Sequence, residues 1–197
     1  MIQAGDTIHN PITGERVTFL KTAAETKGES VLIEVTVEPT GFVAAPHVHP
    51  KQTERFTILE GELTFWTGRE TFTAGAGESV IVPAGTPHKF WNPADVEARF
   101  VCDVTPALGF AELLDTMFAL ARDGKTNRKG LPNPLRMAVI ARAFKDVVRL
   151  PFPPAWMQDC GLAVGAPLGH LMGYRASYAP ASTPAAAASS EPALGAR

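Results

Sequence analysis

The stretch GFVAAPHVHPKQTERFTILEG, residues 41–61, places two histidines and a glutamate directly ahead of an alternating apolar run. His47 and His49 are two residues apart, and residues i and i+2 of an extended segment face the same side. Both imidazoles can therefore point into one cavity. Glu54 shares its parity with Phe56, which indicates a carboxylate on the inward face. Because an unpaired buried carboxylate is very costly, a bound metal ion is one standard way to compensate it.

A second stretch, GESVIVPAGTPHKFWN at residues 77–92, adds His88 after a rigid turn made by Pro83, Ala84 and Gly85. Three imidazoles and one carboxylate form a mixed nitrogen and oxygen set. This set suits Fe, Mn, Ni, Cu, Co or Zn and is too nitrogen-rich for Mg or Ca. The sequence therefore predicts a site for one divalent transition metal ion, built from His47, His49, Glu54 and His88.

Short apolar alternations surround these stretches from about residue 10 to residue 105. Residues 31–37 read VLIEVTV, in which β-branched residues recur at every second position, as is typical of a half-buried strand. Further strands are predicted around Val17 and at 55–59, 63–66, 70–73, 79–82 and 97–104. Glycine and proline separate them. Many short strands with this punctuation favour a sandwich or a barrel.

The spacing of the two stretches resembles the two motifs of the cupin superfamily at every defined position. The first reads Gly-x5-His-x-His-x4-Glu-x6-Gly from residue 41, and the second reads Gly-x5-Pro-Ala-Gly-x2-His-x3-Asn from residue 77. The resemblance covers about residues 15–105. It implies a mainly β fold, the double-stranded β-helix or jelly-roll barrel, followed here by a C-terminal α-helical extension. It also implies that His47, His49, Glu54 and His88 are the metal ligands.

The composition changes after the barrel motifs, and we expect three zones: a cupin β-barrel at 1–105, a helical extension at 106–178 and a flexible tail at 179–197. Helical periodicity predicts helices at 107–122, 135–149 and 155–174, the second with Asn133 and Pro134 at its start. The extension is expected to pack on the barrel or on a partner subunit. The tail is rich in Ala, Pro and Ser and cannot bury enough apolar surface to fold.

Charge and hydropathy exclude several classes of partner. The formal net charge is -2 without a basic cluster, which argues against nucleic acid. No signal peptide and no apolar run long enough for a membrane span are visible, so a cytoplasmic protein is expected. Cys102 and Cys160 are predicted to be reduced thiols. His9 and His170 fall outside the motifs and are predicted to be surface or packing residues.

The sequence is compatible with three hypotheses about the function. Most inward positions are apolar, which favours an uncharged or aromatic small-molecule substrate and a metal-dependent oxidoreductase of dioxygenase type. In that hypothesis Glu54 also acts as a catalytic base, a role that the resemblance suggests. The alternatives are a metal-dependent isomerase, epimerase or cyclase, in which the metal acts as a Lewis acid, and a binding module without turnover. The resemblance also implies a homodimer.

Overall fold

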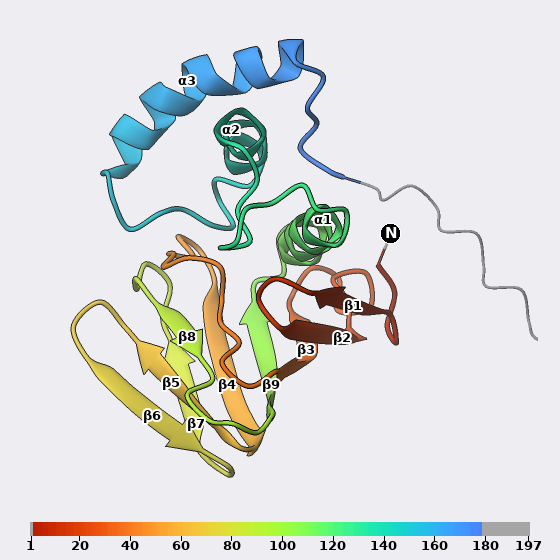
Figure 1. Cartoon of the computed structure of the whole chain (residues 1–197), viewed down its shortest axis with the longest axis vertical. Coiled ribbons are helices and arrows are strands. Elements are labelled where there is room, and N and C mark those ends of the chain that lie inside the picture. The colour runs from red at the N-terminus through yellow and green to blue at the C-terminus, as the bar shows by residue number, and fades with distance from the viewer. Residues whose placement is uncertain (1, 179–197) are drawn as a thin grey trace, which may run out of the picture.

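Nine strands and then three helices make up the described part of the chain, residues 2–178 of this computed structural model (Figure 1). The strands are β1 Thr7–Asn10, β2 Glu15–Lys21, β3 Val31–Val37, β4 Thr53–Glu60, β5 Glu62–Trp66, β6 Thr71–Gly75, β7 Ser79–Val82, β8 Lys89–Trp91 and β9 Ala98–Thr105. The helices are α1 Phe110–Arg122, α2 Pro134–Ala143 and α3 Ala155–Leu171. The tail predicted at 179–197 lies outside the described residues.

The strands form two antiparallel sheets. The larger sheet has the order β1-β2-β3-β9-β4-β7, and the smaller has the order β6-β5-β8. In β3 every second residue is buried, because one face of the sheet is turned inward. The predicted fold class, a mainly β barrel of jelly-roll type followed by helices, is confirmed.

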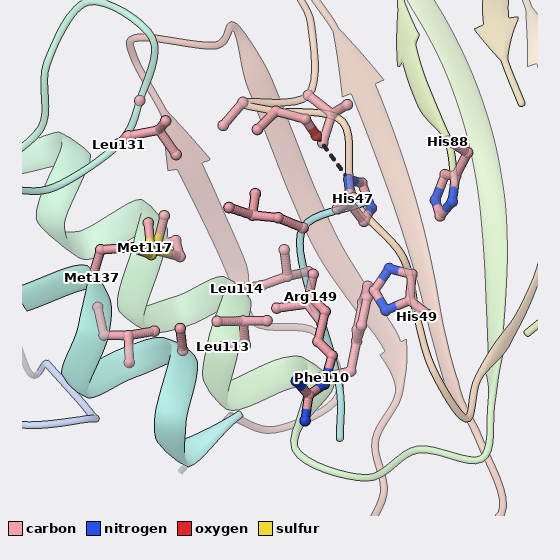
Figure 2. A pocket seen from close by; sticks show the side chains of 18 of the residues that line it. His47, His49, His88, Phe110, Leu113, Leu114, Met117, Leu131, Met137 and Arg149 are labelled. Carbon is pink, nitrogen blue, oxygen red and sulfur yellow. Dashed lines mark hydrogen bonds between the residues drawn. The ribbon is translucent and has the colours of Figure 1, made fainter. Parts of the chain in front are cut away.

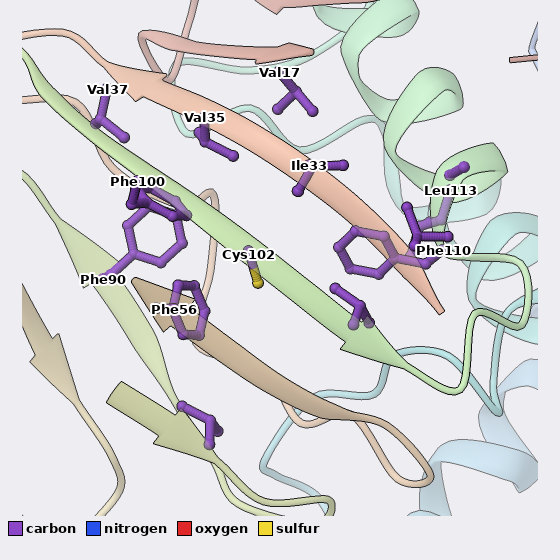
Figure 3. Close-up of a cluster of buried hydrophobic side chains, with 14 of the residues drawn as sticks. Val17, Ile33, Val35, Val37, Phe56, Phe90, Phe100, Cys102, Phe110 and Leu113 are labelled. Carbon is purple, nitrogen blue, oxygen red and sulfur yellow. The ribbon is translucent and has the colours of Figure 1, made fainter. Parts of the chain in front are cut away.

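An aromatic cluster fills the space between the two sheets. Phe56 of β4 and Phe100 of β9 meet Phe65 and Phe90 of the smaller sheet, with ring centroids 5.2 to 6.2 Å apart. Figure 3 shows three of these rings beside Cys102, with further apolar residues continuing along β3 toward α1. Burying one such side chain stabilises the fold by about 2–3 kcal/mol. This close packing makes the interior of the barrel rigid.

The helices cover one end of the larger sheet. Figure 1 shows α1 beside β1 and β2, with α2 and α3 stacked further out. The predicted start of α2 is correct: Oδ1 of Asn133 accepts a hydrogen bond from the backbone N–H of Arg136, and Pro134 is the first helical residue. Tight packing joins α2 to α3, because a Cβ at Gly169 would lie 2.6 Å from the carbonyl oxygen of Leu135.

Three predicted helix boundaries differ from the structure, and one of them is the end of α3, which lies at Leu171 rather than at 174. The first helix begins at Phe110 rather than at 107, because Leu108 has a φ of 45° that a helix does not accept. The second ends at Ala143 rather than at 149, and Arg149 instead pairs in extended form with Val48. Within the described residues, no helix is both long enough and apolar enough to cross a bilayer.

Candidate metal centre

Backbone pairing brings the two histidine-bearing stretches together. The N–H of His47 donates to the carbonyl of His88 at 2.9 Å, and the N–H of His88 donates back at 2.8 Å. The N–H of Gly85 donates to the carbonyl of His49 at 2.8 Å, so the Pro-Ala-Gly turn is tied to the same strand end. Glu54 is the second residue of β4 and is buried on its inner face. One ligand atom from each of the four side chains lies within 4.8 Å of the others.

Each of the three imidazoles is oriented by a backbone carbonyl. Nδ1 of His47 lies 2.9 Å from the oxygen of Ala45, and Nδ1 of His88 lies 3.0 Å from that of Thr86. Nδ1 of His49 lies 2.6 Å from a third carbonyl, on the helical extension. Because a carbonyl can only accept, Nδ1 must carry the proton in each ring, and Nε2 then offers a lone pair. This is the arrangement that metal-binding histidines adopt.

The cluster therefore consists of acceptors. Nε2 of His88 lies 2.7 Å from Oε2 of Glu54, and Nε2 of His49 lies 3.5 Å from Oε1. Oε2 of Glu54 and Nε2 of His49 are buried without a hydrogen-bond partner among the described residues. Unsatisfied buried acceptors are costly. A cation bound between them would satisfy all four, so the residues fit a metal ion.

Burial and mutual charge shift the pKa values of this cluster. Burial first, and then the charges of His88 and His49, lower the pKa of His47 to about 3, so this ring stays neutral. Burial alone would raise the pKa of Glu54, but the surrounding imidazoles outweigh it and lower the pKa to about 2. Burial would lower the pKa of His88, but the adjacent Glu54 carboxylate raises it. A proton on His88 thus competes with a metal ion for the same position.

A cavity of about 610 Å³ opens in front of the cluster. Its walls are mostly apolar and come from the inner face of the larger sheet on one side and from α1, α2 and α3 on the other. Figure 2 shows the histidines on the barrel side, with Leu113, Leu114 and Met117 of α1 facing them. The Phe110 ring lies 5.8 Å from that of His49, centroid to centroid. This volume suits a small organic molecule.

The helical extension also supports the cluster directly, which the sequence did not predict. The carbonyl that orients His49 belongs to Val147, 98 residues further along the chain. Val48 and Arg149 exchange two backbone hydrogen bonds of 2.8 and 2.9 Å and so extend the pairing. The buried amide of Gln52 donates to the carbonyls of Pro106 and Ala107 at 2.9 and 3.1 Å. No local pattern signals contacts over such separations.

The remaining candidates lie elsewhere. His9 is partly exposed and lies 3.7 Å from a carboxylate oxygen of Glu38, and His170 is exposed on α3, so both predictions for them hold. Cys102 and Cys160 are free thiols, the first buried and the second exposed. Burial raises the pKa of Cys102 well above its usual value, so this thiol stays protonated and packs as a small apolar residue.

Comparison with known proteins identifies the same barrel region. Residues 33–104 match the family model of the cupin domain. A germin-like protein of Arabidopsis thaliana, subfamily T member 2, is 37% identical over 111 residues, which cover 53% of this chain and 46% of the relative. Quercetin 2,3-dioxygenase of Bacillus subtilis is 28% identical over 79 residues, which cover 40% of this chain and 23% of the relative. The chain thus spans less than half the length of either protein.

Among solved structures, a predicted oxalate decarboxylase from Thermotoga maritima is similar with a TM-score of 0.47 and 18% sequence identity. The match covers 54% of this chain and 98% of that one.

Proposed function

The chain belongs to the cupin superfamily, and from this premise we propose that it is a metal-dependent oxidoreductase of dioxygenase type acting on a small apolar or aromatic substrate. One observation carries the proposal: four convergent acceptors, three of them on buried residues, lie at the wall of a largely apolar cavity. We propose that His47, His49, Glu54 and His88 bind one divalent transition metal ion. When bound, such an ion supplies a Lewis acid and, if it is redox-active, a site for O₂ chemistry.

The side chains around the cluster would hold the substrate and exclude water. Four protein ligands leave one or two positions free on a five- or six-coordinate ion, and the cavity provides the space in front of them. The apolar wall of α1, beginning with Phe110, would position an aromatic or aliphatic body against His49. Released from the metal, Glu54 would accept the proton of a substrate hydroxyl as the catalytic base.

Sequence similarity to a dioxygenase supports the proposed reaction type. The Bacillus subtilis relative is by name a 2,3-dioxygenase of quercetin, and the apolar lining of the cavity suits a substrate of aromatic character. We extend that reaction type to this chain as a proposal, since the match covers 40% of it.

A metal-dependent isomerase, epimerase or cyclase is the second candidate, because Lys145 lies at the exposed edge of the cavity. A lysine ammonium at this edge would suit an anionic substrate. Arg149 also lines the cavity, but it forms an ion pair of 3.0 Å with Asp159, so its charge is already compensated. The apolar walls therefore favour the first candidate.

Elemental analysis of protein purified without a metal-binding tag tests the proposal. Wild type should contain about one equivalent of a transition metal, and His49→Ala should lose it. His170→Ala is the matched control, because it removes an exposed histidine remote from the cluster. Metal-loaded wild type should then consume O₂ with hydroxylated aromatic substrates. Metal retained by His49→Ala would refute the site. A metal-loaded protein that converts anionic substrates without O₂ would favour the isomerase, and binding without turnover would favour a binding module.

We propose that the barrel and the helical extension meet near residue 105, and that two chains form a homodimer. The described part of α3 carries exposed apolar side chains such as Trp156 and Leu171, which makes it a reasonable face for such contact. Sedimentation of the metal-loaded protein measures the oligomeric state.

A further inference from the structure

A second polar group lines the same cavity and has no part in the metal cluster. Glu15, the first residue of β2, faces inward and is only 7% exposed. Asn10 is its cross-strand partner on β1 and is 2% exposed. Both residues line the cavity. A carboxyl group buried on an otherwise apolar wall is costly, so it calls for a partner.

Strand register places this pair far from the metal cluster. Glu54 pairs with Val104, whereas Glu15 pairs with Val37, whose partner on β9 is Ala98. Along β9 these positions are six residues apart, which corresponds to about 20 Å of strand. Between these two positions, the inward-facing residues of β3 and β9 are apolar. Figure 3 shows this face of the sheet running from Val37 toward Phe110 of α1. The cavity therefore has polar groups at both ends and apolar walls between them.

The hydrogen bonds of the pair leave one acceptor and one donor. Oε2 of Glu15 accepts from Oγ1 of Thr13 at 2.8 Å, and the described residues provide no partner for Oε1. Oδ1 of Asn10 accepts from the N–H groups of Ile12 and Thr13 at 3.0 and 3.3 Å. These bonds fix the amide orientation, so the Nδ2 donor is directed away from that turn. A carboxyl oxygen and an amide N–H₂ thus remain unpaired among the described residues, on two cross-strand neighbours that both line the cavity.

Their chemistry matches a hydroxyl group, which can donate to one atom and accept from the other. Burial raises the pKa of Glu15 to about 7, against the opposing effect of the Thr13 hydrogen bond. This agrees with a carboxyl group that has too few partners. A purely structural role would be served by an apolar residue at this position.

We propose that Glu15 and Asn10 bind a hydroxyl group at the end of the substrate that is remote from the metal. The inference rests on the proposed function, since it takes the cavity as the substrate site. The substrate is then an elongated apolar molecule with a metal-binding oxygen group at one end and a hydroxyl group at the other. Glu15 determines specificity and takes no part in the chemistry.

Binding measurements on the zinc-loaded protein test this. The probes are unbranched alkyl carboxylates of increasing length and the same series with a terminal hydroxyl group, measured by calorimetry. At the length that spans the cavity, the hydroxylated ligand should bind wild type about tenfold more tightly than its parent, as expected for one hydrogen bond to a buried carboxyl group. Glu15→Leu should abolish or reverse this preference and bind the parent carboxylate at least as tightly as wild type does.

A second variant distinguishes a specific change in ligand preference from misfolding. Glu15→Gln keeps an oxygen for Thr13 but turns an N–H₂ donor to the cavity, so its preference should move from a terminal hydroxyl to a terminal keto group. If wild type binds the parent carboxylates as tightly as the hydroxylated ones at every chain length, this inference is wrong. The proposed function would remain intact in that case. If neither series binds zinc-loaded wild type, the cavity is not a substrate site and both proposals fail.

Discussion

The two walls of the cavity differ in what they contribute. The barrel wall carries all four acceptors of the metal cluster and the Glu15–Asn10 pair, whereas the helical wall is mostly apolar and adds one carbonyl, that of Val147. The barrel wall is encoded by short local motifs, and the helical wall is assembled from distant residues. The barrel therefore supplies the polar groups of the site, and the extension mainly shapes the cavity. Changes in the barrel wall should therefore alter metal binding and pH dependence, and changes in the helical wall should mainly alter stability.

The largest expected effect is loss of metal affinity from the barrel wall. His47→Ala removes one of four ligands, and the affinity should fall by more than about 100-fold, since even supporting residues of a metal site are worth about 10- to 100-fold. Competition with a chelator of known affinity measures it. His9→Ala, which removes a partly exposed histidine of β1 outside the cluster, is the control and should bind metal as wild type does. Equal affinities of both variants would contradict the assignment of the cluster.

Glu15 gives the barrel wall a pH dependence. The pKa of this carboxyl group is raised from 4.5 to about 7 in the folded protein. The stabilisation by its bound proton is fully present below pH 4.5 and is lost as the pH rises through 7. Glu15→Gln cannot ionise, so its stability relative to wild type should increase between pH 5 and pH 8 by up to about 3 kcal/mol.

Urea denaturation of Glu15→Gln and wild type at both pH values checks this prediction. Glu34→Gln, in which a partly exposed carboxylate on β3 is replaced, serves as the control and should show no such rise across this range. A stability difference between Glu15→Gln and wild type that is constant with pH would show that Glu15 is ionised throughout.

The helical wall depends on close packing instead. Gly169→Ala would place a Cβ 2.5 Å from Cγ2 of Val139 and 2.6 Å from the carbonyl oxygen of Leu135. The resulting separation of α3 from α2 should lower stability by about 1–3 kcal/mol. Gly161→Ala is a matched control on the same helix, because nothing lies within 4 Å of its Cβ, and helix propensity should make it neutral or slightly stabilising. Thermal unfolding measures both variants.

Metal affinity should be unchanged in Gly169→Ala, because α3 supplies no group to the cluster. A large loss of metal affinity in this variant would break the division between the two walls.

The sequence predicted the barrel wall well because its signals are local. The i, i+2 spacing of His47 and His49 and the turn before His88 are set by a few neighbouring residues, and the structure brings these side chains together with Glu54. Glu15 was missed, although it shares its parity with Val17 and Phe19 on an inward face. That alternation was the available signal for an inward carboxyl group.

The helical wall was predicted less well because its contacts are distant in sequence. Residues 144–149 continue a helical pattern, yet the chain leaves the helix and Arg149 pairs with Val48. A backbone partner 98 residues from His49 cannot be inferred from either segment alone. Tertiary pairing here outweighs local helix propensity.

The smallest expected effect tests the link between the two walls. Arg149 is the strand partner of Val48, and its guanidinium forms the 3.0 Å ion pair with Asp159 of α3. Asp159→Asn removes that pair. Because Asp159 is half exposed, stability should fall by about 1 kcal/mol or less, and the loss should shrink at high salt.

Metal affinity of Asp159→Asn should change by less than about threefold, which is what 0.6 kcal/mol would give. Arg16→Gln, which removes an exposed ion pair between β2 and Glu97, is the control. A tenfold loss of metal affinity in Asp159→Asn alone would mean that α3 orients His49 through Arg149 and the Val147 carbonyl. The helical wall would then belong to the metal centre, and the two walls would be one functional unit.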